Sequence, residues 1–195
     1  MSIIDKVIAA VTPLESAKAR ADARATAAAA EPRDWLSLVL DHHIELEDAL
    51  GAVECCTTQD DRADAFKDFA ILLTGHAIAE EAVLYPSLSA NAETGHAGVG
   101  YSEQAMVKIQ MAALEKLDPL SQEFEDKLGH VKGALLHHMY EEESNWFLEL
   151  KNNSSPDDQE LMTSRYAEEF DRYVGDAGGI LEDEDDIEDE DDIED

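Results

Sequence analysis

The sequence has little cysteine: its 195 residues include two, Cys55 and Cys56, which are adjacent. Two neighbouring cysteines cannot form the disulfide framework that holds small secreted domains together. Their spacing also differs from the Cys-x-x-Cys of thiol redox sites and of cysteine-based zinc sites. We therefore expect a reducing, cytoplasmic location and an unreactive pair of thiols.

Long hydrophobic runs are also missing. The apolar stretch SIIDKVIAAVTP at 2–13 is interrupted by Asp5 and Lys6 and lacks the basic start of a signal peptide. No other stretch approaches the roughly 20 apolar residues that a membrane-spanning helix needs. The sequence therefore predicts neither a secretion signal nor a membrane segment.

Basic residues are scarce relative to acidic ones. The chain has 14 lysines and arginines against 46 aspartates and glutamates, which gives a net charge of −32 at pH 7. Residues 182–195, EDEDDIEDEDDIED, form a repetitive acidic run that cannot bury enough apolar surface to fold. A chain of this charge repels phosphate backbones and anionic lipid, so we expect no nucleic-acid partner and no membrane partner.

Glycine and proline are few, at 10 and 5 residues, and they concentrate between long segments with apolar residues at helical spacing. Gly51 is expected to close the first of these segments, and residues 91–100 are expected to form a loop. Four amphipathic helices joined by short loops predict an all-α fold, an up-down-up-down four-helix bundle. The four helices are expected at about 32–50, from about 60 to shortly after Pro86, 101–117 and 121–151.

Further helices are expected outside the bundle. Residues 2–11 suit a short amphipathic helix, and the alanine-rich, charged residues 14–30 favour an exposed helical arm. Ser155 and Pro156 resemble an N-cap and a first-turn proline, so a short fifth helix is expected to about Val174. The expected organisation is an N-terminal helical arm at 1–31, a four-helix metal-binding domain at 32–174 and an acidic disordered tail at 175–195.

Histidines and glutamates interrupt the apolar stripes of two predicted helices. His76 and Glu80 are four residues apart in the second helix, and His138 and Glu142 repeat the spacing in the fourth. Side chains at i and i+4 share a helix face, about 5–6 Å apart, so each pair can direct two ligand atoms at one point. A buried glutamate is costly unless its charge is compensated, and neither stripe carries a lysine or arginine. The pattern therefore predicts a bound cation.

The first predicted helix adds two adjacent histidines. His42 shares the apolar stripe of Trp35 and Leu46 and is the expected ligand, whereas a rotation of the helix would present His43 instead. Imidazole combined with carboxylate favours iron, manganese or zinc over copper(I) or calcium. Two carboxylates among several histidines suit a pair of metal ions bridged by the glutamates.

Three segments together resemble a known family: DHH at 41–43, HAIAEEAVLYP at 76–86 and HMYEEESNWF at 138–147. They are similar to the hemerythrin-like, HHE cation-binding family. Its pattern is a histidine on helix one, His-x-x-x-Glu on helices two and four, and a histidine on helix three. The resemblance spans about residues 33–174 and implies a four-helix bundle around a non-haem di-iron centre. It implies metal-ligand roles for His42, His76, Glu80, His138 and Glu142, with the two glutamates as bridges.

Helix three departs from the family pattern. The segment YSEQAMVK at 101–108 has Gln104 at the position that matches the expected histidine, and an amide oxygen is a weak, neutral ligand. The second metal is then looser, absent, or coordinated by water, Glu103, Tyr101 or His96. The sequence leaves open whether one or two metal ions bind.

Several neighbouring residues are expected to have lesser roles. Glu81 and Glu143 follow the bridging candidates and are expected to form outer hydrogen bonds or to face water. His137 and Glu141 repeat the i, i+4 spacing, but their register places them outside. Tyr85 can reach the site as a hydrogen-bond donor, although aromatic residues near a bundle core more often pack.

The resemblance implies reversible oxygen binding, sensing of iron or oxygen, or a response to nitric oxide or oxidative stress. We therefore predict a non-haem iron protein that binds or senses oxygen, nitric oxide or peroxide, with one or two iron ions and with manganese or zinc as alternatives. A di-iron oxidase or peroxidase is the alternative, although no separate acid, base or substrate motif favours it, and no catalytic residue is assigned. A metal-free helical interaction module is the third hypothesis, because of Gln104.

Overall fold

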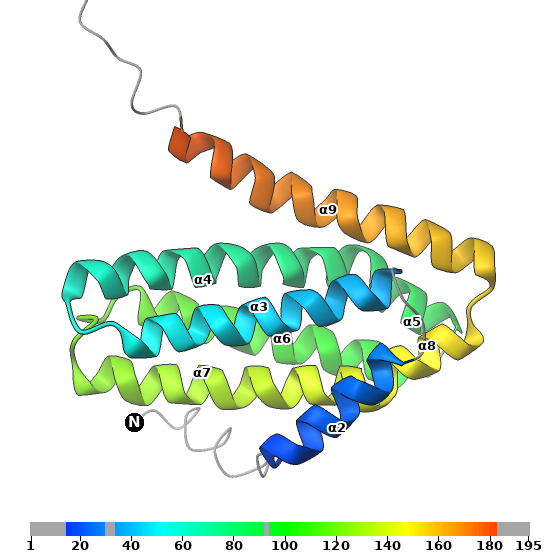
Figure 1. The fold of residues 1–195 in the computed structure, drawn as a ribbon, viewed down its shortest axis with the longest axis horizontal. Coiled ribbons are helices and arrows are strands. Elements are labelled where there is room, and N and C mark those ends of the chain that lie inside the picture. Colours follow the sequence, from blue (N-terminus) through cyan, green and yellow to red (C-terminus); the bar gives the residue numbers. More distant parts are fainter. Residues whose placement is uncertain (1–14, 30–33, 92–93, 183–195) are drawn as a thin grey trace, which may run out of the picture.

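The computed structural model describes residues 15–29, 34–91 and 94–182, and these residues form helices and their connections, with no strand among them. Four helical rods lie side by side, with successive rods running in opposite directions (Figure 1). The all-α, up-down-up-down four-helix bundle is therefore confirmed. The rods are α3 (Trp35–Cys55); α4 (Gln59–Ala79) continued by the π-helix η1 (Glu80–Leu84) and α5 (Tyr85–Asn91); α6 (Thr94–Leu114); and α7 (Gln122–Glu141) continued by the π-helix η2 (Glu142–Trp146) and α8 (Phe147–Asn153).

Among the described residues, the helices α2 and α9 pack outside the bundle (Figure 1). The arm helix α2 (Ala17–Ala28) lies against η2 and α3, and α9 (Pro156–Glu182) lies against α4 and α3. The fifth helix is longer than expected, since α9 continues through Gly175. The helix expected at 2–11 and the acidic repeat beyond residue 182 lie outside the described residues. Among the described helices, none combines the length and the apolar character that crossing a membrane requires.

Polar side chains begin several of these helices. Asp34 accepts hydrogen bonds from the backbone N–H groups of Leu36 and Ser37, and the Ser155 hydroxyl accepts one from Asp158 at 3.2 Å. The first N–H groups of a helix have no intrahelical acceptor, so such a cap stabilises the start of the helix. The predicted cap at Ser155 is therefore present.

The structure differs from the sequence-based helix boundaries at two places. Gly51 does not end its helix, because burial of Leu50 and Val53 outweighs the roughly 1 kcal/mol that a glycine costs inside a helix. Residues 94–100 begin α6 instead of forming a loop, and Ala97 from this stretch is buried in the core. Pro86, expected near the end of the second helix, lies at the start of α5, and this rod ends at Asn91.

The core consists of two apolar clusters with a polar layer between them. One cluster lies at the α5 and α8 end of the bundle and includes Trp35, Leu84 and Phe147. The other extends toward the α3–α4 connection and includes Leu46 and Phe69. The buried histidines and glutamates lie between these clusters along each rod, so they are surrounded by apolar packing above and below.

Candidate metal centre

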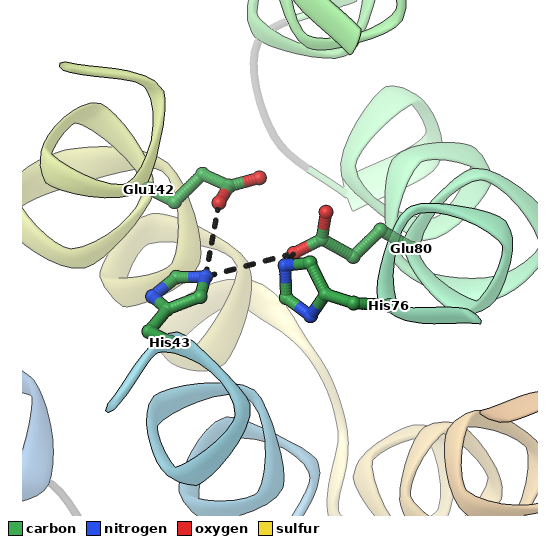
Figure 2. Close-up of side chains that lie close together, drawn as sticks. All are labelled: His43, His76, Glu80 and Glu142. Atoms are coloured by element: carbon green, nitrogen blue, oxygen red, sulfur yellow. Dashed lines mark ion pairs between the residues drawn. The ribbon is translucent and has the colours of Figure 1, made fainter. Parts of the chain in front are cut away.

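Four side chains from three rods of the bundle converge in the polar layer (Figure 2). His43 of α3, His76 of α4, Glu80 of η1 and Glu142 of η2 each offer one atom, and these atoms lie within 4.8 Å of one another. The Nε2 atom of His43 is 3.4 Å from Glu142 Oε2 and 4.0 Å from Glu80 Oε1. The Nε2 atom of His76 is 3.3 Å from Glu80 Oε1. All four side chains are buried.

The converging atoms have no hydrogen-bond partner within the described chain. They are His43 Nε2, His76 Nε2, Glu80 Oε1 and Glu142 Oε2. A single buried polar atom without a partner costs about 1–3 kcal/mol, so four around one point need a shared explanation. A cation satisfies all four at once, because imidazole nitrogen and carboxylate oxygen are ligands of iron, manganese and zinc. The residues present therefore fit a metal ion.

Both glutamates begin a π-helical turn. The N–H of Tyr85 donates to the carbonyl of Glu80 in η1, and the N–H of Phe147 donates to the carbonyl of Glu142 in η2. Residues five apart lie on different faces of an α-helix, whereas an i→i+5 hydrogen bond brings the fifth residue back above the first. The π turn of η1 therefore directs the Tyr85 hydroxyl toward the site.

The outer nitrogen of each inward-facing histidine also has a partner. A bond of this kind fixes the orientation and tautomer of an imidazole, so that its other nitrogen faces the metal position. The pairs are His43 Nδ1 with Glu143 Oε1 at 2.8 Å, His76 Nδ1 with the Tyr166 hydroxyl at 3.0 Å, and His138 Nδ1 with Glu103 Oε2 at 2.8 Å.

His42, the ligand expected from helix one, lies outside the converging group. Its Nδ1 is 2.9 Å from the Tyr166 hydroxyl, and its ring stacks on Phe170 of α9 with centroids 3.7 Å apart. Burial, followed by the charge of His43, lowers the pKa of His42 to about 4, so the ring is neutral at pH 7 and can accept a hydrogen bond. The structure thus brings His43 to the other three residues and places His42 against α9.

A second group of atoms surrounds the hydroxyl of Tyr85. This oxygen is 3.0 Å from His138 Nε2, 2.9 Å from Glu142 Oε1 and 3.4 Å from Glu80 Oε2. The side-chain nitrogen of Gln104 donates to it at 2.8 Å and to Glu80 Oε2 at 2.5 Å. Each glutamate therefore directs one oxygen to the first group and one to the second, the arrangement that a bridging carboxylate requires.

Without a cation, burial and neighbouring charges disfavour the ionised forms of several side chains in this layer. Burial, and then the charge of Glu142, raises the pKa of Glu80 well above its usual value. Burial, and then the charge of His43, lowers the pKa of His76 well below its usual value. Burial, and then the charges of both glutamates, raises the pKa of Tyr85. A bound cation opposes the shifts of Glu80 and Tyr85, because positive charge favours their ionised forms.

The arm helix α2 contacts the centre through Arg24. Its Nε donates to Glu143 Oε1 at 2.8 Å, the same oxygen that pairs with His43, and its Nη2 lies 2.6 Å from Glu47 Oε1. Glu81, which follows Glu80 as Glu143 follows Glu142, instead pairs with Lys108 at the surface. The two glutamates that follow the bridging candidates therefore have different environments.

Arg24 and Tyr166 are absent from the sequence-based prediction. Met162, Tyr166 and Phe170 recur every four residues in α9, a signal that this face packs on the bundle. Nothing in the sequence distinguishes Arg24 from the other basic residues of α2. His137 and Glu141 lie outside the centre, as expected. There they form a separate, half-buried cluster with Glu15.

Comparisons with known proteins concern the family and the fold. The family model of the hemerythrin HHE cation binding domain matches residues 34–150. A solved hemerythrin HHE cation binding domain-containing protein from Mycobacterium kansasii has a similar fold, with a TM-score of 0.65 at 22% identity over 75% of this chain and 90% of that one. A curated DNA nickase from Nostoc sp. is 33% identical over 98 residues. That match covers 50% of this chain and 27% of the nickase, so this chain spans about a quarter of that relative's length.

Proposed function

This chain belongs to the hemerythrin HHE cation-binding domain family, and from that premise we propose that it holds a non-haem iron centre that binds oxygen, nitric oxide or peroxide. Metal binding follows from the family and from the cluster of His43, His76, Glu80 and Glu142. The choice of iron rests on the mixed imidazole and carboxylate donors, and manganese and zinc are the alternatives.

The observation that carries the proposal is the set of four buried ligand atoms without a hydrogen-bond partner. His43, His76, Glu80 and Glu142 would hold the first ion through these atoms. Glu142 Oε1 lies 3.3 Å from His138 Nε2, and Glu80 Oε2 lies 3.4 Å from the Tyr85 hydroxyl, so these two oxygens would help to hold a second ion. Iron, when bound, supplies an open coordination position for a small ligand. The apolar clusters on either side exclude bulk water, and the outer partners of the histidines keep the rings in place.

The predictions on location and partners follow from charge and composition. We propose a cytoplasmic protein without a nucleic-acid partner, because the net charge of −32 opposes binding to phosphate backbones. The nickase match covers 27% of that protein, and its nicking activity is a property of that protein. A mobility shift of duplex DNA by this chain at moderate salt would contradict the proposal.

Two adjacent histidines test the proposed ligand set. After anaerobic loading with iron(II) and desalting, we expect the wild-type chain to retain iron and His43→Ala to lose most of it. His42→Ala is the matched control and should still retain iron, because its ring lies against α9. The measurement is the iron-to-protein ratio.

Two other results would contradict different parts of the proposal. Loss of iron in His42→Ala and retention in His43→Ala would restore His42 as the ligand. A wild-type chain that holds no iron after reconstitution would defeat the proposed function itself.

A further inference from the structure

The two glutamate-bearing rods repeat one spacing but differ at its end. His76, Glu80 and Tyr85 on one rod correspond to His138, Glu142 and Phe147 on the other. Phe147 is fully buried and packs edge-to-face on Trp35, with centroids 5.6 Å apart. Tyr85 is equally buried, but its ring carries a hydroxyl into the polar layer. Burying a hydroxyl is costly without polar partners, so packing alone does not account for tyrosine here.

Helix α6 makes room for this hydroxyl. A Cβ atom at Gly100 would lie 2.8 Å from Cζ of Tyr85 and 3.1 Å from its hydroxyl oxygen, so the ring lies where a larger residue would be. One turn later, at the position of the expected histidine, Gln104 donates its amide N–H to the Tyr85 oxygen. Helix α6 therefore offers space and a hydrogen-bond donor at this point, and its amide nitrogen is not a metal ligand.

The atoms around Tyr85 have the spacing of ligands on one ion. The Tyr85 oxygen, His138 Nε2, Glu142 Oε1 and Glu80 Oε2 come from three different chemical groups that coordinate iron. The Tyr85 oxygen lies 2.9–3.4 Å from the other three atoms, and His138 Nε2 lies 3.3 Å from Glu142 Oε1. Ligand atoms bound about 2.0–2.2 Å from one ion are separated by about 3 Å.

We propose that the Tyr85 oxygen is a ligand of the second metal position, together with His138 and the outer oxygens of Glu80 and Glu142. This inference rests on the proposed iron centre and assigns the ligand that helix three lacks. On binding, the phenolic O–H bond breaks, its proton passes to solvent, and the oxygen bonds to the ion as phenolate without a change of oxidation state. The Gln104 amide keeps donating to that oxygen, which stabilises the anion.

With Tyr85 as a ligand, the second metal position carries more negative charge than it would with a histidine in that place. A phenolate adds negative charge that an imidazole does not, so this position favours the ferric over the ferrous ion. The first position, with two histidines and the shared glutamates, lacks that bias. The two halves of the centre are therefore chemically different.

The test uses the full chain loaded with iron and oxidised to the ferric state. A phenolate bound to iron(III) absorbs visible light by charge transfer, and excitation there enhances the ring vibrations of tyrosine in resonance Raman spectra. We expect this signature in the wild-type chain and its loss in Tyr85→Phe, with a lower iron-to-protein ratio. Tyr101→Phe is the matched control, because its ring packs on Tyr85 while its hydroxyl donates to the carbonyl of Glu81. That variant should keep the signature.

A second variant keeps the inference testable if Tyr85→Phe fails to fold. Gly100→Ala retains the tyrosine but pushes its ring, so the charge-transfer band should shift or weaken. An iron-loaded wild-type chain without the signature, a signature that survives Tyr85→Phe, or an unchanged band in Gly100→Ala would overturn the inference while leaving the iron centre intact. A wild-type chain that takes up no iron would overturn the proposed function and this inference together.

Discussion

Removing the bound metal with a chelator is expected to lower the melting temperature of this protein by on the order of 10 °C. An ion that binds only the folded state stabilises it by about 4 kcal/mol at a thousand times its dissociation constant, and each kcal/mol shifts the melting of a domain this size by about 2–4 °C. The effect is large here because the ligands lie between the two apolar clusters, where water cannot replace the ion.

Thermal unfolding followed by circular dichroism, with and without chelator, measures this shift. The control for non-specific effects of the chelator is Glu80→Gln, whose melting temperature should respond to it much less than that of the wild type. Equal melting temperatures of the metal-loaded and chelator-treated wild-type chains would show that the buried ligands do not hold an ion.

Glu80→Gln is expected to have opposite effects on the two forms of the protein. It removes a bridging carboxylate, so metal loading should fall below one ion per chain. It should also stabilise the metal-free chain, by on the order of 1–3 kcal/mol at neutral pH, because the cost of burying or protonating the carboxylate is removed while an amide oxygen remains to accept from Gln104. Glu80 is fully buried, and burial raises its pKa well above the usual value.

The pH dependence of this difference has a definite sign. A carboxyl group whose pKa is raised in the folded state stabilises the fold below its unfolded pKa, near 4.5, and that contribution is lost as pH rises toward the folded pKa. The advantage of metal-free Glu80→Gln over the metal-free wild type should therefore grow as pH rises above about 4.5. Urea unfolding of both metal-free chains across this range measures it.

Glu81→Gln is the matched control for this experiment. Glu81 is the next residue along, but it pairs with Lys108 at the surface, so its substitution should change neither metal loading nor metal-free stability appreciably. A metal-free Glu80→Gln chain less stable than wild type, or one that loads iron fully, would contradict the account.

Much of the fold was accessible from the sequence because local patterns determine it. Apolar residues at helical spacing and the cap at Ser155 are properties of short segments, and they predict the helices and the bundle. The paired spacing of His76 with Glu80 and of His138 with Glu142 predicts a convergent site, because residues at i and i+4 share a face of one helix. The structure brings these four residues into the polar layer.

The remaining features depend on contacts between distant segments. His42 and His43 differ by 100° on the helix, and the packing of α9 through Tyr166 and Phe170 decides which one faces the centre. Those contacts are more than a hundred residues away in the sequence. Helix periodicity alone therefore could not choose between the two histidines.

The π-helical turns also could not be predicted from the sequence. Regular α-helical spacing from Glu80 would direct Tyr85 away from the site, and the i→i+5 hydrogen bond reverses that. The same limit applies to residues 94–100, where three glycines suggest a loop but burial of Ala97 favours helix. In each case tertiary packing outweighs the local preference.

The most direct test of the central claim is the location of the metal in crystals of the iron-loaded protein, from anomalous diffraction at the iron edge. The account predicts strong density within bonding distance of Nε2 of His43 and His76 and of the carboxylates of Glu80 and Glu142. Iron density found instead at the half-buried group of Glu15, His137 and Glu141, with none in the polar layer, would contradict it.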